Sequence, residues 1–158
     1  MSTCTFFGHR QCPTGLRPQL QSVLIDLIVT QRVHTFYVGN QGSFECMVAS
    51  VLDKLCQEYP NITYGIVFPC LPIKQPVAET DTAGNSRSIV PEGIEKFAKP
   101  LSIDWRNRWM LDRADYVVTY VTHPWGEAAK FAQLAQRMGK RVVNLDPPSS
   151  MISYIGRL

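Results

Sequence analysis

Near the start of the chain an arginine closely follows a glycine, in the tripeptide Gly8-His9-Arg10. A glycine lets a ligand approach the backbone closely, and the planar guanidinium of an arginine can bind two phosphate oxygens at once. The tripeptide alone also describes a plain turn with a surface arginine. Gly8, His9 and Arg10 are therefore candidate ligand-binding residues whose role depends on what lies beside them.

A second small loop has the sequence Gly39-Asn40-Gln41-Gly42-Ser43, with Glu45 two residues later. A short glycine-containing turn that leads into a helix presents free N–H groups and the positive end of the helix dipole, which suits an anion. Glu45 either caps this helix or binds ribose hydroxyls. The spacing matches neither the dinucleotide-binding glycine fingerprint nor the Walker loop, which disfavours ordinary dinucleotide oxidoreductases and P-loop ATPases. The candidates here are Gly39, Asn40, Gly42, Ser43 and Glu45.

A third loop, His123-Pro124-Trp125-Gly126-Glu127, also leads into a helical pattern. Gly126 at the helix start makes it a second candidate anion site. Glu127 has the chemistry of a general acid or base, although a carboxylate in the first turn of a helix commonly serves only the helix dipole.

An arginine-rich helical segment, Trp105-Arg106-Asn107-Arg108-Trp109, precedes this loop. On a helix Arg106 shares a face with Met110 while Arg108 points elsewhere, so we expect at most one of these arginines to reach a ligand. Arg106 and Asn107 are the candidates. Trp105 and Trp109 are predicted to lie in the core.

Strand-like and helical patterns alternate along the chain. The strand-like segments are residues 3–7, 35–38, 62–68, 116–121 and 142–145, and the helical ones are 16–28, 44–56, 102–113 and 128–138. This alternation predicts an α/β Rossmann-like three-layer sandwich, with a five-stranded, mainly parallel sheet in the order 3-2-1-4-5. Ligands of such sheets bind at the carboxyl ends of the strands, where the strand order reverses, so the three loops should meet there.

Residues 69–100 lose this periodicity and contain Pro69, Pro72, Pro76, Pro91 and Pro100. A long irregular segment inside a compact domain is often a functional lid or a mobile loop. We expect a short helix at about residues 91–97 and the least order of the chain elsewhere in this segment. The whole of residues 1–158 is predicted to form a single domain.

Composition places the chain among ordinary globular proteins, with 45% hydrophobic residues and a formal net charge of +3. The sequence shows no signal peptide and no apolar run of about 20 residues, and its five cysteines are an odd number, so we predict a soluble cytoplasmic protein with reduced thiols. Cys46 and Cys56 are expected in the core. Cys4, His9 and Cys12 lack a fourth ligand at a suitable spacing, so we predict no metal and no cofactor.

Taken together, three segments resemble the SLOG superfamily of Rossmann-like proteins. They are Gly8-His9-Arg10, the run from Val38 to Glu45, and Trp105-Arg106-Asn107-Arg108-Trp109-Met110 ahead of Ala114-Asp115-Tyr116-Val117-Val118. The chain is similar to small stand-alone bacterial members of the YpsA-like type, over about residues 3–145. This superfamily also contains the Lonely Guy phosphoribohydrolases and DNA-processing protein A. The resemblance implies a site for a nucleotide or a nucleotide derivative at the loops named above.

The resemblance also bears on catalysis. The phosphoribohydrolases carry an arginine-containing helix, and then a Gly-Gly-x-Gly-Thr-x-x-Glu loop that ends in a catalytic glutamate. Arg106 looks like the match for their arginine. Their glycine-rich pattern is not reproduced, because this chain has only Gly126, followed directly by Glu127.

Three functions are therefore considered. The first is the binding or sensing of a nucleotide-derived small molecule. The alternative is a phosphoribohydrolase-like nucleoside monophosphate N-glycosidase with Glu127 as its catalytic carboxylate. Single-stranded DNA binding is the weakest, because it would need a basic groove with exposed aromatic side chains. We predict no membrane partner, disfavour nucleic acid as a partner, and find the sequence compatible with a homo-oligomer.

Overall fold

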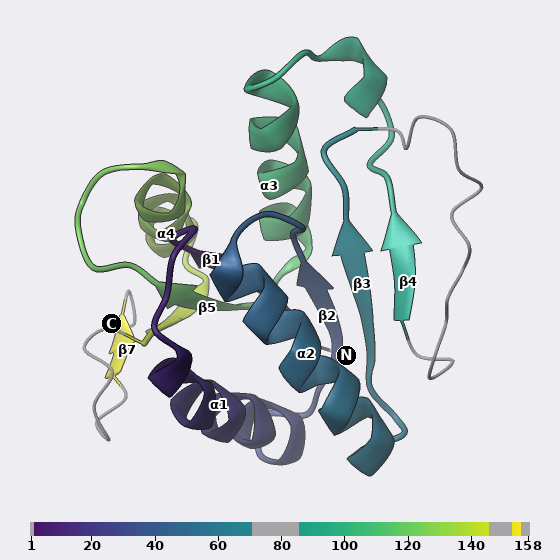
Figure 1. The fold of residues 1–158 in the computed structure, drawn as a ribbon, viewed down its shortest axis with the longest axis vertical. Helices are drawn as coiled ribbons and strands as arrows, with labels where there is room; N and C mark the ends of the chain where they lie inside the picture. The colour runs from purple at the N-terminus through teal and green to yellow at the C-terminus, as the bar shows by residue number, and fades with distance from the viewer. Residues whose placement is uncertain (1, 71–85, 146–152, 156–158) are drawn as a thin grey trace.

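The computed structural model describes residues 2–70, 86–145 and 153–155. Within them, seven strands form one sheet in the order β4-β3-β2-β1-β5-β6-β7 (Figure 1). The neighbouring strands run parallel except for the antiparallel pair of β6 and β7. The strands are β1 (Ser2–Gly8), β2 (Val33–Val38), β3 (Thr63–Val67), β4 (Ser86–Ile89), β5 (Tyr116–Tyr120), β6 (Arg141–Asn144) and β7 (Ser153–Ile155).

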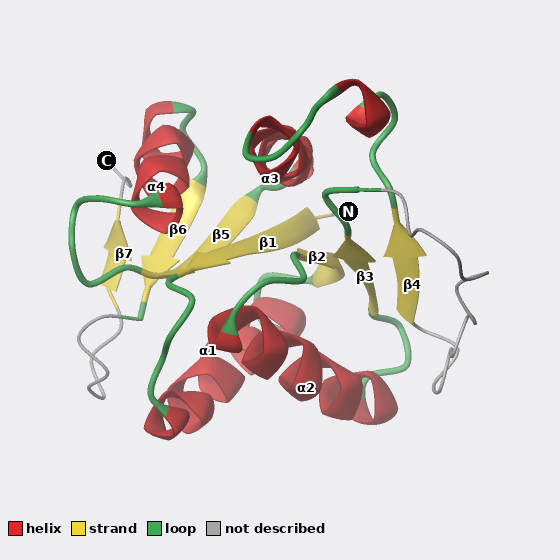
Figure 2. Ribbon diagram, turned by 45° about the horizontal axis from the view of Figure 1, so that its top comes forward, coloured by secondary structure: helices red, strands yellow, loops and turns green. Residues whose placement is uncertain are grey.

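Helices cover both faces of the sheet, as Figure 2 shows: α1 and α2 lie on one face, and α3 and α4 on the other. Their bounds are α1 (Arg17–Val29), α2 (Ser43–Glu58), α3 (Leu101–Arg113) and α4 (Glu127–Arg137), with short 3-10 helices η1 (Thr14–Leu16) and η2 (Ile94–Lys96). Pro18 falls in the first turn of α1, where its missing N–H has no intrahelical partner to lose. The sheet and the pairs of helices on its two faces therefore form the predicted three layers.

The predicted strand order is correct for the five predicted strands, which are β3, β2, β1, β5 and β6. The predicted number of strands is wrong, because β4 and β7 extend the sheet at its two edges. The sequence of β4 is Ser-Arg-Ser-Ile, which has no apolar alternation to mark it as a strand. Residues 71–85 of the predicted irregular segment lie outside the described residues. Its predicted short helix corresponds to η2.

The sheet divides the core into two clusters because successive side chains of a strand point to opposite faces. In β1, Phe6 packs under α1 and α2, and Phe7 packs under α3 and α4. In β5, Val118 and Val117 divide in the same way. No helix in the described part of the chain is long and apolar enough to cross a membrane.

Two predicted core positions are wrong. Cys56 is buried as expected, but Cys46 is exposed because it lies off the apolar stripe of α2. Trp105 is 41% exposed, since the opposite side of α3 faces the sheet. Its ring stacks on Phe97 with 5.0 Å between centroids. Trp109 is half-buried against Tyr37.

Candidate functional site

The loops that follow β1 and β2 meet α3 and the start of α4 at a small cleft. The strands β2, β3 and β4 point toward the end of the molecule where α3 begins (Figure 1). The cleft has a volume of about 90 Å³ and is lined by Phe7, Gly8, Arg10, Gln41, Glu45, Ile103, Arg106, Asn107, Glu127 and Ala128. Segments far apart in the sequence thus converge at the carboxyl edge of the sheet.

The first two loops are held together by backbone contacts. Gly42 has a φ of +92°, and a Cβ there would lie 2.7 Å from the Cα of Arg10. The N–H of Ser43 donates to the carbonyl of Arg10 at 2.6 Å, and the hydroxyl of Ser43 donates to the same oxygen at 2.8 Å. The backbone of Arg10 is therefore fixed, while its side chain is exposed and reaches Gln41 Oε1 at 3.5 Å.

Two N–H groups of the loop that leads into α2 bind oxygens of the protein itself. The N–H of Ser43 already has its acceptor in Arg10, and the N–H of Gln41 donates to the carboxylate of Glu45. The loop therefore has fewer N–H groups for a ligand than the sequence pattern suggested, and its role as an anion site stays a prediction. The carboxylate of Glu45 binds the N–H of Gln41, which lies in the loop before α2, and its predicted ribose contact stays a prediction.

Arg106 lies in the wall of the cleft and links the segments around it by hydrogen bonds. Its side chain is only 2% exposed, and Nη1 donates to the carbonyl of Val67 at 3.0 Å and to Asn40 Oδ1 at 3.1 Å. Its Nε donates to Asn107 Oδ1 at 2.7 Å. Burial lowers the pKa of Arg106, and the charges of Glu45 and Glu127 oppose that shift. Arg106 ties α3 to the ends of two strands.

Gly39 makes room for the charged pair behind the cleft. A Cβ on Gly39 would lie 2.6 Å from Oε1 of Glu45 and 2.8 Å from Nη1 of Arg106. Glu45 is 8% exposed. Burial raises its pKa, while the charge of Arg106, the N–H of Gln41 and the charge of Arg10 oppose the rise.

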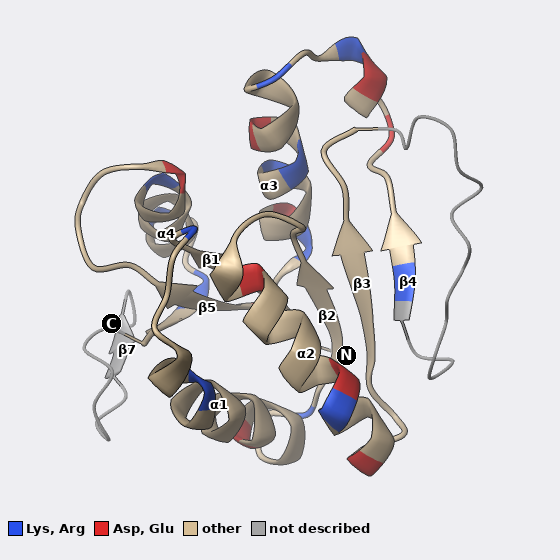
Figure 3. Ribbon diagram, viewed as in Figure 1, with Lys and Arg blue, Asp and Glu red and all other residues tan. Residues whose placement is uncertain are grey.

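A second carboxylate, Glu127, lies at the rim of the cleft in the first turn of α4. Figure 3 shows acidic residues in α2 and α4, and both first turns contain one. Burial, a hydrogen bond with Asp104 and the charge of Asp104 raise the pKa of Glu127, against the charges of Lys130 and Arg106. Lys130 Nζ lies 2.9 Å from Asp104 Oδ2 and joins α4 to α3.

The pKa of Asp104 moves in the opposite direction. Burial would raise it, but hydrogen bonds with Lys130 and Glu127 outweigh burial and leave the pKa lowered. When Glu127 is protonated it can donate to the Asp104 carboxylate. The arrangement can therefore hold a proton on Glu127 beside an arginine, as a general acid requires.

Beside the cleft, three aromatic rings form a stack. The rings of His9 and His123 lie 3.9 Å apart between centroids, and those of His123 and Trp125 lie 4.0 Å apart. His9 is fixed because its Nε2 accepts the N–H of Thr122 at 2.9 Å. Sequence reasoning gave His123 and Trp125 no role. Their place in a loop directly before Gly126 was the signal available.

The structure thus places the predicted residues in three settings. Gly8, Arg10, Glu45, Arg106, Asn107 and Glu127 line the cleft. The residues that shape or brace its loops are Gly39, Asn40, Gly42, Ser43 and Gly126. His9 lies in the ring stack. Among the residues described, no group of three or more His, Cys, Asp or Glu side chains is placed to hold a metal ion.

Comparison with known proteins finds solved structures whose fold is similar to that of this chain. The chain is similar to DNA processing protein A from Helicobacter pylori, with a TM-score of 0.61 and 14% identity over 90% of this chain and 64% of that one. It is also similar to DNA processing protein A from Streptococcus pneumoniae, with a TM-score of 0.64 and 12% identity over 91% of this chain and 50% of that one. The description of the Helicobacter structure reports a single-stranded DNA binding mode for that protein.

The chain spans less than two thirds of the length of either of these proteins. No family model matches the sequence, and no curated protein does. At this identity the likeness establishes a shared α/β fold with a parallel sheet flanked by helices. The superfamily, with its YpsA-like and phosphoribohydrolase-like features, stays a prediction.

Proposed function

We propose that the chain binds a nucleotide-derived small molecule, with the anionic group of the ligand between the side chain of Arg10 and the first turn of α4. The observation that carries this proposal is that Arg10, Glu127 and Ala128 line one cleft. The first N–H groups of a helix have no intrahelical acceptor, and the helix dipole favours an anion beside them. Arg10 adds an exposed guanidinium that makes a long hydrogen bond to Gln41, at 3.5 Å, and acts on Glu45 through its charge.

The start of α4 suits this role better than the start of α2. The α2 loop gives two of its N–H groups to Arg10 and Glu45, whereas Gly126 leaves open space at the start of α4. A Cβ on Gly126 would find only His123 Cε1, at 4.0 Å. Arg106, with its Nε and Nη1 engaged, acts by holding the wall of the cleft.

The size of the cleft limits how much of the ligand it holds. Its volume of about 90 Å³ is well below the roughly 300–1,000 Å³ of pockets that enclose a whole drug-sized ligand. A phosphate or sugar-phosphate end fits this space, and the rest of the ligand lies outside. Glu127 and Asn107 supply acceptors for ribose hydroxyls at its wall.

The test is calorimetric titration with a panel of nucleoside monophosphates. Arg10→Ala should weaken binding by about ten- to a hundredfold, because a charge-assisted contact to phosphate is lost. Arg10→Lys should restore part of the affinity, since lysine keeps the charge without the planar fork. Arg108→Ala is the matched control, because Arg108 pairs with Asp112 on the exposed surface. Unchanged affinity of Arg10→Ala for every nucleotide that binds would refute the proposed site.

Hydrolysis of the N-glycosidic bond is a second candidate, favoured by the raised pKa of Glu127 beside Asp104. If the chain catalyses this hydrolysis, incubation with the same nucleotides should release free base, which chromatography detects. Glu127→Gln should keep binding and lose release. Absence of free base from every nucleotide bound would leave binding alone as the function.

Single-stranded DNA binding is the third candidate, favoured by the fold shared with DNA processing protein A and by the exposed ring of Trp125. A gel shift with unstructured oligonucleotides tests it. A shift at concentrations where mononucleotides do not compete would favour nucleic acid over the small molecule.

A further inference from the structure

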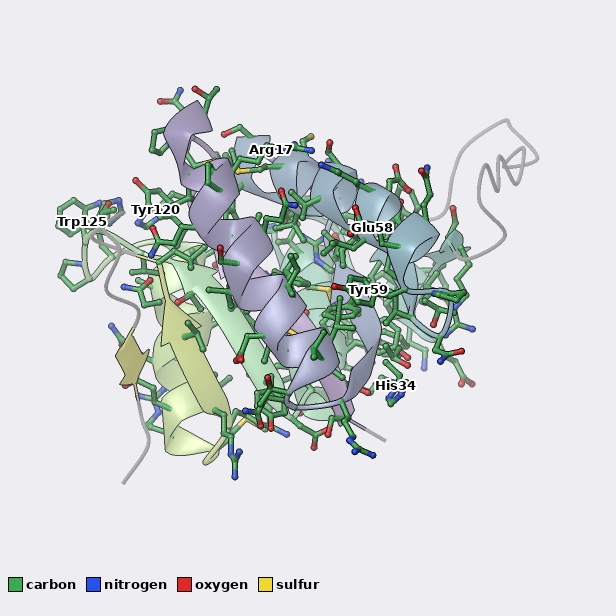
Figure 4. The ribbon with its side chains drawn as sticks, turned by 90° about the horizontal axis from the view of Figure 1, so that it is seen from below. Arg17, His34, Glu58, Tyr59, Tyr120 and Trp125 are labelled. Carbon is green, nitrogen blue, oxygen red and sulfur yellow. The ribbon has the colours of Figure 1, made fainter. Side chains whose placement is uncertain are left out.

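Trp125 is held against a neighbouring ring and yet exposed. Its surface is 66% exposed, although its ring stacks on His123 with 4.0 Å between centroids and an interplanar angle of 17°. One face of the indole is therefore covered by imidazole. The exposed surface is mainly the opposite face. In Figure 4, Trp125 projects from one end of the molecule, near Tyr120.

The rings beneath Trp125 continue into the core. His123 stacks on His9 at 3.9 Å, and His9 meets Tyr120 edge to face at 6.1 Å. Tyr120 stacks in turn on Phe44, which is fully buried. The backbone N–H of His9 also donates to the carbonyl of Tyr120 at 3.1 Å. His9 is therefore held in place, and the other two rings are packed on it before any ligand arrives, which reduces the entropy lost on binding.

The stack lies next to the cleft, both in the sequence and in the structure. His9 lies between Gly8 and Arg10, and both of these line the cleft. Trp125 comes two residues before Glu127, which lies at the rim. The position of a Cβ on Gly126 is 4.0 Å from His123 Cε1. A ligand with its phosphate at the start of α4 would therefore have its remaining part beside the rings.

We infer that the free face of Trp125 stacks on the nucleobase of the ligand, so that the ligand class is a nucleotide with its base attached rather than a sugar phosphate. This inference rests on the proposed function. The cleft is too small to enclose a base, and a base is the planar part of a nucleotide that an indole face accepts. Stacking accepts any base, so the stack sets the class of ligand and leaves the choice of base to other contacts.

The experiment compares AMP with ribose 5-phosphate, which has the same sugar and phosphate and no base. In Trp125→Ala, affinity for AMP should fall by about ten- to a hundredfold, while affinity for ribose 5-phosphate stays unchanged. Trp125→Phe should keep most of the affinity for AMP, because phenylalanine retains an aromatic face. Trp105→Ala is the matched control, since Trp105 is also exposed and does not line the cleft.

The outcomes separate the inference from the proposed function. If Trp125→Ala leaves AMP binding unchanged, or weakens AMP and ribose 5-phosphate equally, the inference is wrong and the phosphate site stands. If neither compound binds the wild-type protein, the proposed function fails and the inference falls with it. Far-UV circular dichroism checks that each variant is folded.

Discussion

At the scale of single residues, the site depends on groups that hold one another in place. Gly39 lacks a side chain where Glu45 and Arg106 close over the end of β2. Glu45 caps the loop through the N–H of Gln41, and Arg106 reaches the carbonyl of Val67. Arg10 is left with an exposed side chain on a fixed backbone. The buried charges therefore build the cleft, and the exposed charge of Arg10 is the one that we propose meets the ligand.

Gly39→Ala should destabilise the protein by about 1–3 kcal/mol, the usual cost of forcing a methyl group into a packed interior. The new Cβ would lie 2.6 Å from Oε1 of Glu45 and 2.8 Å from Nη1 of Arg106. Gly15→Ala is the control, because a Cβ on Gly15 meets nothing within 4 Å. The free energy of unfolding is measured by urea denaturation. Equal stability of the two variants would show that the pair behind Gly39 yields without cost.

Glu127 should make phosphate binding depend on pH. Burial, and then Asp104, raises the pKa of Glu127 above its ordinary value. Above this raised pKa the ionised carboxylate repels a phosphate at the start of α4, and below it the neutral carboxyl does not. Glu127→Gln should therefore bind AMP more tightly than the wild type at pH values above that raised pKa, by about three- to tenfold. The two affinities should converge as the pH falls through the raised pKa.

The comparison at each pH removes the titration of the phosphate itself, whose second pKa is about 6. Glu95→Gln, a change at an exposed residue of η2, serves as the control. A ratio of wild-type to Glu127→Gln affinity that stays constant across the pH range would contradict the placement of the phosphate beside Glu127.

At the scale of elements, α2 and α4 begin in the same way and differ in their surroundings. Each helix follows a glycine that combines a positive φ with an extended ψ. These angles are φ +92° and ψ 168° at Gly42, and φ +95° and ψ 172° at Gly126. Residues other than glycine rarely adopt this backbone conformation. The Gly42 turn packs on the backbone of Arg10, whereas the Gly126 turn is open. The start of α2 is therefore packed against another loop, and the start of α4 is the one that we propose as the ligand site.

Gly42→Ala should be more destabilising than Gly126→Ala. Both variants strain the backbone, at a cost of about 1–3 kcal/mol. Only the Cβ at position 42 also meets backbone, at 2.7 Å from the Cα of Arg10. Urea denaturation of the two variants side by side measures the difference. If Gly126→Ala proved the more destabilising, the start of α4 would be the tighter junction.

At the scale of the whole molecule, stability should be greatest in the middle of the sheet. β1 is paired on both sides, with β2 and β5, and its central side chains are buried on both faces. β4 pairs with β3 and lies at the edge of the described sheet. The amides of β1 and β5 should therefore exchange with deuterium most slowly, and those of β4 much faster. Native-state hydrogen exchange measures this order, and protection of β4 equal to that of β1 would contradict it.

The sequence by itself determined the elements that depend on local patterns. The alternation of helical and strand-like periods located the four long helices and five of the strands, and the reversal in strand order brought the three loops to one edge. It could not locate β4, whose polar residues become a strand only because β3 offers a partner. Nor could it tell that Trp105 faces solvent, because the pattern of α3 does not show which side meets the sheet.

Only the tertiary structure decided which contacts each candidate site residue makes within the protein. Arg106 meets Val67 across 39 positions of sequence, and His9 meets Thr122 across 113. Contacts of this range arise from the packing of one element on another, and local sequence does not encode them. They tie Arg106 to the end of β3, bind two N–H groups of the α2 loop to oxygens of the protein, and place Trp125 on a stack of two imidazoles. The residue types indicated which chemistry was available. Packing determined which of those groups bind other parts of the protein.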